Sequence, residues 1–332
     1  MKKFIPIIII LFFASLCFCS NNTNDSEIQQ TPKCQPYFYS SETYINLNGP
    51  SETGSVSFAQ ECEYLYIGGF ANPPNAYLYK INISTHELIY KAIPQKAYRM
   101  VLVGDYLWTA GGSTGAAGIG SFYLQKINKN SLESEWEDHS TFDDVRALAY
   151  DGKYIWAADR GTTKRLHRIN PETNEIYSYE GIILDGARHM CFDGTYLWVT
   201  CSSSGSIVRI KPEDRSFTVI NGLSNVWAIC FDGINIIAAC MTGNIYKIDT
   251  ATAAVIQSST LTDCLWLCHA DYDGKYIWIT DNSNANVKIV NPLDLSLIDT
   301  IDTLAMPHKS HYDGKYQWIL HEDNVRLFKL SK

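Results

Sequence analysis

The sequence lacks the short motifs that mark the commonest nucleotide-dependent and hydrolytic enzymes. It has no Gly-rich phosphate-binding loop, no nucleophile elbow and no Cys-x-x-Cys pair. It also lacks an excess of basic residues, because 27 Lys and Arg face 35 Asp and Glu, which gives a net charge of −8. Such a charge opposes binding to polyanions, so we expect neither nucleic-acid binding nor a general attraction to anionic membranes.

Long apolar runs are absent except at the N-terminus. Lys2 and Lys3 precede the apolar run Phe4–Phe18, which is shorter than the roughly 20 residues of a membrane-spanning helix and is typical of an export signal. The end of this segment, SLCFCSNN, resembles a bacterial lipoprotein signal in which Cys19 carries the lipid. A signal that is simply cleaved is the alternative.

These features predict three parts of the chain. Residues 1–19 are interpreted as a lipoprotein-like signal peptide, and the polar residues 20–42 as a tether between the anchor and a folded body. Residues 43–332 form that body. We therefore expect an exported, membrane-anchored bacterial lipoprotein on the periplasmic or surface side, which touches the membrane only through its lipid.

The composition of the body favours strands. The chain is 46% hydrophobic and 13% aromatic, enough to bury a substantial core. Tyr and Trp prefer strands, and the many Gly, Asn, Asp and Ser residues prefer tight turns. An all-β fold is predicted.

One heptapeptide, YDGKYIW, occurs at Tyr150–Trp156 and again at Tyr272–Trp278. Related segments are FDGTYLW (192–198), FDGINII (231–237), YDGKYQW (312–318), VGDYLW (103–108) and ECEYLY (61–66). The seven last residues lie 39 to 48 positions apart: Tyr66, Trp108, Trp156, Trp198, Ile237, Trp278 and Trp318. A period of this length with short strands indicates the blades of a β-propeller, here seven blades of four antiparallel strands.

The parts of each repeat have physical reasons. The Asp-Gly pair supplies the positive φ of a tight hairpin, and the aromatic residue of the following strand can pack against a neighbouring blade. The seventh repeat has room for only three strands before the chain ends, whereas the strand-like segment Tyr44–Leu47 precedes the first repeat. We predict that this N-terminal strand completes the last blade, which closes the ring and leaves no long open edge.

The repeats, with their DG-x-hydrophobic-Trp pattern followed by Ile-Asn or Ile-Asp before a turn, resemble bacterial seven-bladed propellers of the YVTN type over residues 43–332. The virginiamycin B lyase family and gluconolactonase-like proteins share this architecture. The resemblance implies the fold but leaves the function open, since propellers serve binding, scaffolding and catalysis. The metal- and His-dependent chemistry of the lyases is not implied, because no local motif matches it, and no cofactor is expected.

A ligand site is expected where the first strand of each blade opens at the mouth of the central channel. In each repeat, the residue four positions before the Tyr/Phe-Asp-Gly lies near this channel mouth. In the sixth repeat this residue is Cys268, or Trp266 if a two-residue bulge shifts the strand. The candidate ligand-binding residues are Arg99, Arg146, Arg188, Trp227, Trp266 and His308. Guanidinium groups pair with carboxylate or phosphate and Trp rings stack on sugars, which predicts an anionic or glycan-like ligand. Alternatively, the Arg residues hold adjacent blades together through carbonyls or through Asp144 and Asp185.

His189 and His269 occupy equivalent positions one residue further along their strands, and His308 and His311 lie in the last blade. Metal binding or general-base catalysis would require them to converge with carboxylates. Because they lie in different blades, we expect ordinary packed or surface residues and predict no catalytic and no metal site.

The cysteines of the body read first as small core residues. Cys191 with Cys230, and Cys201 with Cys240, recur at equivalent repeat positions. Export would permit a disulfide between Cys34 and Cys62.

Three functions follow from these patterns. The first is a monomeric, non-catalytic propeller that binds a small ligand or an envelope protein at the channel mouth. The second is an enzyme of lyase or lactonase type, with Arg188, His189, His269 and His308 around a pocket, with or without a divalent metal. The third is an envelope scaffold that uses the long loops Gly111–Ser121 and Gly68–Ala76.

Overall fold

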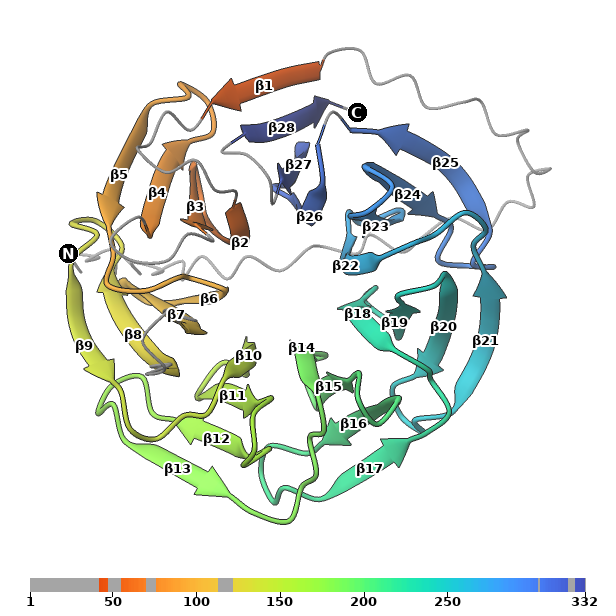
Figure 1. Ribbon diagram of the computed structural model, residues 1–332, viewed down its shortest axis with the longest axis horizontal. Helices are drawn as coiled ribbons and strands as arrows, with labels where there is room; N and C mark the ends of the chain where they lie inside the picture. The colour runs from red at the N-terminus through yellow and green to blue at the C-terminus, as the bar shows by residue number, and fades with distance from the viewer. Residues whose placement is uncertain are drawn as a thin grey trace, which may run out of the picture. The chain divides into compact units, whose positions relative to one another are not determined.

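The protein folds as a seven-bladed β-propeller. The computed structural model describes residues 42–46, 55–69, 76–112, 122–303, 305–321 and 326–331, all within the compact unit Tyr37–Lys332. Their 28 strands form seven four-stranded antiparallel sheets around a common axis (Figure 1). No helix occurs among these residues, and so none that could span a bilayer. The predicted fold class is confirmed.

Blades 1 to 6 each use four consecutive strands, ordered from the axis to the rim (Figure 1). Blades 1 to 3 contain β2 (Ser55–Glu61), β3 (Tyr64–Gly69), β4 (Tyr77–Asn82), β5 (Leu88–Ala92); β6 (Arg99–Val103), β7 (Tyr106–Gly112), β8 (Phe122–Asn128), β9 (Ser134–Asp138); and β10 (Val145–Tyr150), β11 (Ile155–Asp159), β12 (Leu166–Ile169), β13 (Ile176–Tyr179). Blades 4 to 6 contain β14 (Ala187–Phe192), β15 (Leu197–Cys201), β16 (Ser206–Ile210), β17 (Phe217–Ile220); β18 (Val226–Phe231), β19 (Asn235–Cys240), β20 (Asn244–Asp249), β21 (Val255–Thr260); and β22 (Leu267–Tyr272), β23 (Ile277–Asp281), β24 (Asn286–Val290), β25 (Leu297–Asp302).

Blade 7 joins the two ends of the propeller. Its three inner strands are β26 (Pro307–Tyr312), β27 (Tyr316–His321) and β28 (Arg326–Ser331), and its outer strand is β1 (Glu42–Asn46). The antiparallel pairing of β1 with β28 runs from Glu42 opposite Leu330 to Asn46 opposite Arg326. The predicted ring closure is therefore confirmed. The signal 1–19 and nearly all of the tether 20–42 lie outside the described residues and stay predictions.

The Asp-Gly turns form as expected, and the Asp does more than shape the turn. The turn glycines have φ between 87° and 96°: Gly152, Gly194, Gly233, Gly274 and Gly314. Asp193 Oδ1 accepts hydrogen bonds from the backbone N–H of Thr195 (2.7 Å) and Tyr196 (2.6 Å), and its Oδ2 accepts one from Trp198 Nε1 (2.7 Å). The repeats of Asp151, Asp273 and Asp313 have the same three bonds. The carboxylate thus joins the hairpin turn to the buried aromatic residue.

Three blades depart from this arrangement. Blade 1 has Glu61-Cys62-Glu63 at the turn and Tyr66 in place of the Trp. In blade 5, Ile237 stands in place of the Trp, and Asp232 keeps only the two backbone bonds. In blade 2 the order is Gly104-Asp105, and the buried Trp108 Nε1 has no partner among the described residues. These departures provide natural controls for the contribution of the Asp–Trp bond.

The aromatic residue of each second strand fills the space between its blade and the next one. Trp198 is fully buried against Val226, Ile229 and Ile236 of blade 5. The other blade pairs are packed in the same way by Tyr66, Trp108, Trp156, Ile237, Trp278 and Trp318. The predicted packing against a neighbouring blade is confirmed.

The cysteines contribute to these cores. Cys201, Cys230 and Cys240 are buried, Cys191 is half-buried, and all four are free thiols. Cys62 is an exposed free cysteine and forms no disulfide, and Cys34 lies outside the described residues.

Candidate functional site

One face of the propeller is built from two loops of each blade. The loop before the first strand is bonded to the loop between the second and third strands, as in Arg160 N to Asp144 O (2.9 Å), Ser202 N to Gly186 O (3.0 Å) and Asn282 N to Trp266 O (2.9 Å). We call this the mouth face and define it by the loops 143–144, 160–163, 185–186, 202–205, 222–225, 241–243, 263–266 and 282–285. These two sets of loops therefore share one face of the propeller.

A β-bulge marks the predicted site position in six of the seven first strands, β6 being the exception. A bulge re-aims the side chain that it carries. In blade 6 the register shifts between Leu267 and His269, so Cys268 occupies the position. Placing Trp266 there through a two-residue bulge is therefore wrong. Trp266 belongs to the preceding loop, where Asp281 Oδ1 accepts its backbone N–H at 3.0 Å.

The six candidate residues nevertheless come together. The rings of Trp266 and Trp227 meet edge to face at 5.7 Å, and the guanidinium carbon of Arg188 lies 3.8 Å from the centre of the Trp227 ring. Arg99 Nη2 donates to the carbonyl of Arg188 at 3.0 Å. Since blade 3 separates Arg99 from Arg188 in the ring, the Arg99 side chain reaches past blade 3 to blade 4.

Tyr98, which the sequence analysis missed, connects the remaining candidates. Its ring centre lies 4.4 Å from the guanidinium carbon of Arg146 and 4.7 Å from that of Arg99, and its ring lies 6.1 Å from that of His308. An aromatic residue directly before a predicted site Arg was the available signal. All six candidates thus belong to one contiguous network.

Exposure divides this network into two layers. Arg99 and His308 are only 5% and 2% exposed and lie beneath the surface. Arg146, Arg188, Trp227 and Trp266 are half-buried at the mouth face. A ligand at the surface therefore reaches the second group directly. Arg99, which bonds blade 2 to blade 4, fits the alternative in which Arg residues hold blades together.

Three arginines at the mouth face are held by Nε alone. Arg146 Nε and Arg160 Nε donate to the two oxygens of Asp144, the latter at 2.9 Å, and Arg188 Nε donates to Ser202 Oγ at 3.0 Å. The Nη atoms of these arginines have no partner among the described residues. Arg160 was missed because it lies in the loop after β11 rather than in a first strand. The anchored guanidinium groups leave their paired donors available.

Positive charge exceeds negative charge in this network. Within the described part of the chain, Asp144 is the one carboxylate in ion-pair contact with Arg146 and Arg160, and neither Arg99 nor Arg188 has such a contact. Burial, and after it the charge of Arg160, lowers the pKa of Arg188 to about 10. Burial likewise lowers the pKa of Arg99 to about 10. A bound anion would oppose both effects.

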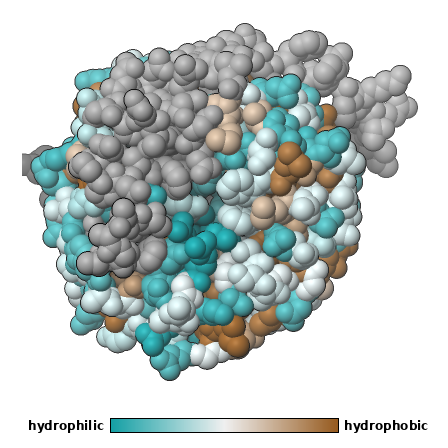
Figure 2. All heavy atoms as spheres, in the orientation of Figure 1, coloured by the Kyte–Doolittle hydropathy of each residue, from teal (hydrophilic) through white to brown (hydrophobic). Residues whose placement is uncertain are grey.

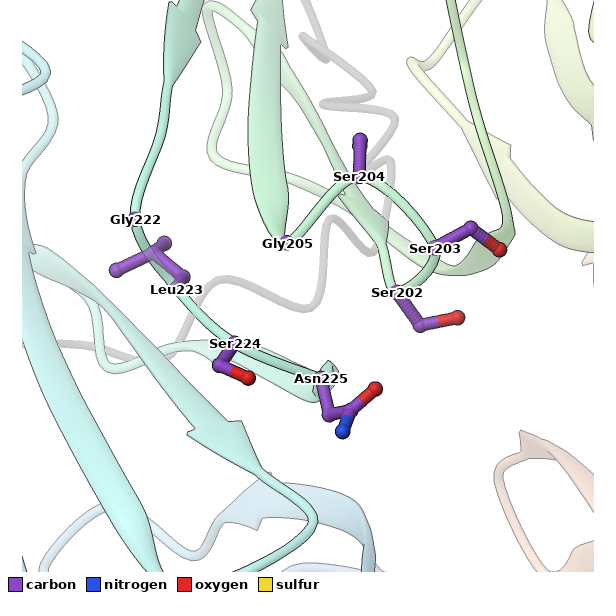
Figure 3. Close-up of a pocket in the computed structure, with 8 residues that line it drawn as sticks. All are labelled: Ser202, Ser203, Ser204, Gly205, Gly222, Leu223, Ser224 and Asn225. Carbon is purple, nitrogen blue, oxygen red and sulfur yellow. The ribbon is translucent and has the colours of Figure 1, made fainter.

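A surface pocket adjoins Arg188. It is lined by Ser202–Gly205 and Gly222–Asn225, two loops of neighbouring blades that face each other (Figure 3). Ser202 is shared, because its Oγ accepts from Arg188 and donates to Gly186 O at 3.1 Å. Looking down the axis, hydrophilic residues gather toward the middle of the visible described surface and hydrophobic patches lie nearer its rim (Figure 2).

The histidines also converge, which the sequence could not show. The ring centres of His189 and His269 lie 5.5 Å apart, although the two residues belong to blades 4 and 6. His189 is buried and His269 half-buried. Among the residues that the structure describes, no three His, Cys, Asp or Glu side chains form a group that could hold a metal ion.

Comparisons with known proteins support the fold alone. No family model and no curated protein matches the sequence. Among solved structures, virginiamycin B lyase from Staphylococcus aureus is similar with a TM-score of 0.72 and 16% identity, over 88% of this chain and 99% of the lyase. The WD40 repeats of RRP9 align with a TM-score of 0.71 and 11% identity, over 87% of this chain and 97% of that one. The structure of U3-55K aligns with a TM-score of 0.72 and 10% identity, over 87% of this chain and 98% of that one. The chain shares the propeller architecture with an enzyme and with WD40 proteins.

Proposed function

We propose that this chain is an exported, lipid-anchored, monomeric propeller that binds a small anionic ligand at the mouth face without transforming it. The ligand carries a carboxylate or phosphate whose oxygens accept hydrogen bonds from the paired Nη–H groups of Arg146 and Arg188. Its flat or sugar-like part lies against Trp227 and Trp266. An envelope protein that presents such a group is equally compatible with this chemistry.

The observation that carries the proposal is the geometry of Arg188. Its Nε is fixed by Ser202 and its plane rests on Trp227, so the side chain is held in place before any ligand arrives. Its two Nη groups then remain without a described partner. A preorganised guanidinium loses little side-chain entropy on binding, which favours affinity. Trp266 adds a buried indole N–H that also has no partner among the described residues.

The other two functions receive less support. A lyase- or lactonase-type reaction would need His189 and His308 at a ligand, but both are buried beneath the mouth face. The scaffold interpretation depends on the loops Gly111–Ser121 and Gly68–Ala76, and most of both lies outside the described residues.

The proposal is tested by thermal-shift screening against sugar acids, organic acids, phosphosugars and neutral sugars. We expect an anionic compound to raise the melting temperature and Arg188→Ala to abolish that rise. Arg209→Ala is the matched control, because Arg209 also packs on an aromatic ring, Tyr196, but bonds to the carbonyls of Thr250 and Ala251. An equal loss in both variants, or hits confined to neutral compounds, would contradict the proposal.

The anchor is tested separately. Labelling with a fatty-acid probe should mark the parent protein and not Cys19→Ala, and the variant should move from the membrane fraction to the soluble fraction. Label that persists in Cys19→Ala would disprove the assignment of Cys19.

A further inference from the structure

Beneath the mouth face, basic side chains of the innermost strands of blades 2, 4, 6 and 7 come close to one another. His189, His269 and Lys309 each follow the mouth position of their strand by one residue. The ring centres of the two His residues lie 5.5 Å apart, although blade 5 separates their strands, and the charge of Lys309 acts on both. Arg99, one position nearer the mouth face, reaches from blade 2 to the carbonyl of Arg188 in blade 4. We call His189, His269, Lys309 and Arg99 the axial cluster.

The axial cluster presents hydrogen-bond donors that the protein does not use. His269 Nδ1 accepts the backbone N–H of Ser310 at 3.3 Å, so the neutral ring carries its proton on Nε2. That Nε2 has no hydrogen-bond partner among the described residues. Two buried nitrogens, His189 Nε2 and Arg99 Nε, also have no partner among the described residues; Arg99 Nε is a donor, and His189 Nε2 is a donor in the tautomer that carries its proton there.

Lys309 adds an ammonium group without a counterion. It makes no hydrogen bond and no ion pair with any residue that the structure describes. Its side chain is half-buried. Its strand, β26, is the innermost strand of blade 7 and faces the centre of the ring (Figure 1).

One carboxylate acts on this cluster without pairing with it. Asp271 is the carboxylate whose charge acts on Lys309, yet the two form no ion pair. Its Oδ2 already accepts the backbone N–H of Tyr312 at 2.9 Å and Gln317 Nε2 at 3.4 Å. Two cationic side chains, Arg99 and Lys309, therefore share the axis with one carboxylate that is bonded elsewhere.

The lowered pKa values of Lys309 and His269 agree with a cluster of basic groups that has no anion beside it. Burial, followed by the charge of Arg99, holds the pKa of Lys309 well below its usual range. Burial, followed by the charge of Lys309, does the same to the pKa of His269. A negative charge between them would raise both pKa values again.

We propose that one small inorganic anion, of halide size, binds on the axis between Lys309 and the His189–His269 pair, with Arg99 closing the site on the mouth side. Lys309 supplies the charge, and the imidazole and guanidinium N–H groups supply the remaining hydrogen bonds. The anion reduces the repulsion between four strands of different blades, so it acts as an internal bond of the ring. This site does not depend on the ligand proposed for the mouth face.

Bromide is the probe, because it can be located by anomalous scattering. Crystals of the full-length chain grown in sodium bromide should show an anomalous peak on the axis within hydrogen-bond distance of Lys309 Nζ. In solution, the melting temperature should rise by a constant step for each tenfold increase in bromide above the dissociation constant, relative to gluconate at equal ionic strength. Lys309→Met should lose this dependence.

Lys126→Met is the matched control. Lys126 is also buried, but it donates to Pro171 O and Asn174 Oδ1 at 3.0 and 3.1 Å between blades 2 and 3. This variant should keep the full bromide dependence, as should Arg188→Ala. An empty axis in the anomalous map, or a bromide dependence that survives Lys309→Met, would overturn the proposal. If Lys309→Met does not fold, the map of the unaltered protein decides alone.

Discussion

The bond between the turn Asp and the buried Trp can be measured by comparing two blades. Asp193 and Asp232 accept the same two backbone hydrogen bonds in their turns, but only Asp193 also accepts an indole N–H. Asp193→Asn and Asp232→Asn therefore differ in one interaction. Asn can keep the backbone bonds through its single oxygen, and its amide nitrogen then takes the position of the second carboxylate oxygen.

The expected losses follow from this geometry. In Asp232→Asn only the charge assistance of two partly exposed bonds is lost, which costs about 0.5–1 kcal/mol. In Asp193→Asn the amide N–H₂ also faces the indole N–H of Trp198, a fully buried residue that water does not reach. An unsatisfied buried donor costs roughly 1–3 kcal/mol more. We expect the second variant to lose that much more of its free energy of unfolding.

Urea unfolding followed by Trp fluorescence measures both losses, provided that the m-value stays unchanged. Repeating Asp193→Asn in a Trp198→Phe background should reduce its cost to that of Asp232→Asn, because no indole N–H remains. Equal losses in the two single variants, within about 0.5 kcal/mol, would refute the argument that the Asp–Trp bond is a separate stabilising element.

Three further predictions concern closure, pH and the loop that holds Arg188. Deleting residues 43–48 removes β1 and opens blade 7, so the melting temperature of the whole propeller should fall; an unchanged midpoint would show that closure contributes nothing. Burial lowers the pKa of His311 to about 4, so the folded state resists protonating this residue. Its contribution to the free energy of unfolding is complete above pH 6.5 and is lost as pH falls from 6.5 to 4. The loss is at most about 1.4 kcal/mol of unfolding free energy per pH unit. His311→Gln should therefore flatten the dependence of unfolding free energy on pH in this window, and an identical slope would exclude His311 as a cause. Gly186 has a φ of 77°, and a Cβ there would meet the backbone of Ser203, so Gly186→Ala should lower the melting temperature. Gly181→Ala is the control, because Gly181 has a φ of 90° but open space around a Cβ, and it should lower the melting temperature less.

The fold was predictable because the same sequence pattern recurs in each blade. The Asp-Gly turns, the following aromatic residues and the spacing of 39 to 48 residues each recur along the chain, and a repeated unit that cannot bury its own aromatic face must stack on its neighbours. Counting strands then left one strand missing at the C-terminal end and one unmatched near Tyr44. Their pairing required only that an open edge be avoided.

The Asp–Trp bond was not predicted, although its signal is present. A carboxylate precedes a Trp by five positions at Trp156, Trp198, Trp278 and Trp318. The Asp-Gly turn alone explains the Asp, so nothing in the pattern demanded a second role. The hairpin geometry, which brings the indole back over the turn, was needed to reveal it.

The site was predictable in position but not in depth. Strand register placed Arg99, Arg146 and Arg188 at one end of the inner strands, because equivalent positions of equivalent blades must lie on one circle. The sequence does not predict the radius of that circle, so it does not predict whether an Arg side chain is long enough to reach another blade. As a result, the crossing of Arg99 to the Arg188 carbonyl and the meeting of His189 with the histidine of blade 6 appear only in the structure.

Blade-to-blade bonding and ligand binding are compatible roles for these arginines. A guanidinium group has five N–H donors, and anchoring through Nε uses one of them. Arg188 is anchored in this way at Ser202, and its paired Nη donors remain available on the surface. Arg99 shows the opposite use, since its Nη1 and Nη2 donate to the carbonyls of Tyr98 and Arg188. The atoms engaged, rather than the residue type, thus separate the arginine that joins blades from those whose paired Nη donors can receive a ligand at the mouth face. Substituting Arg99 should therefore reduce stability most, whereas substituting Arg188 should reduce binding most.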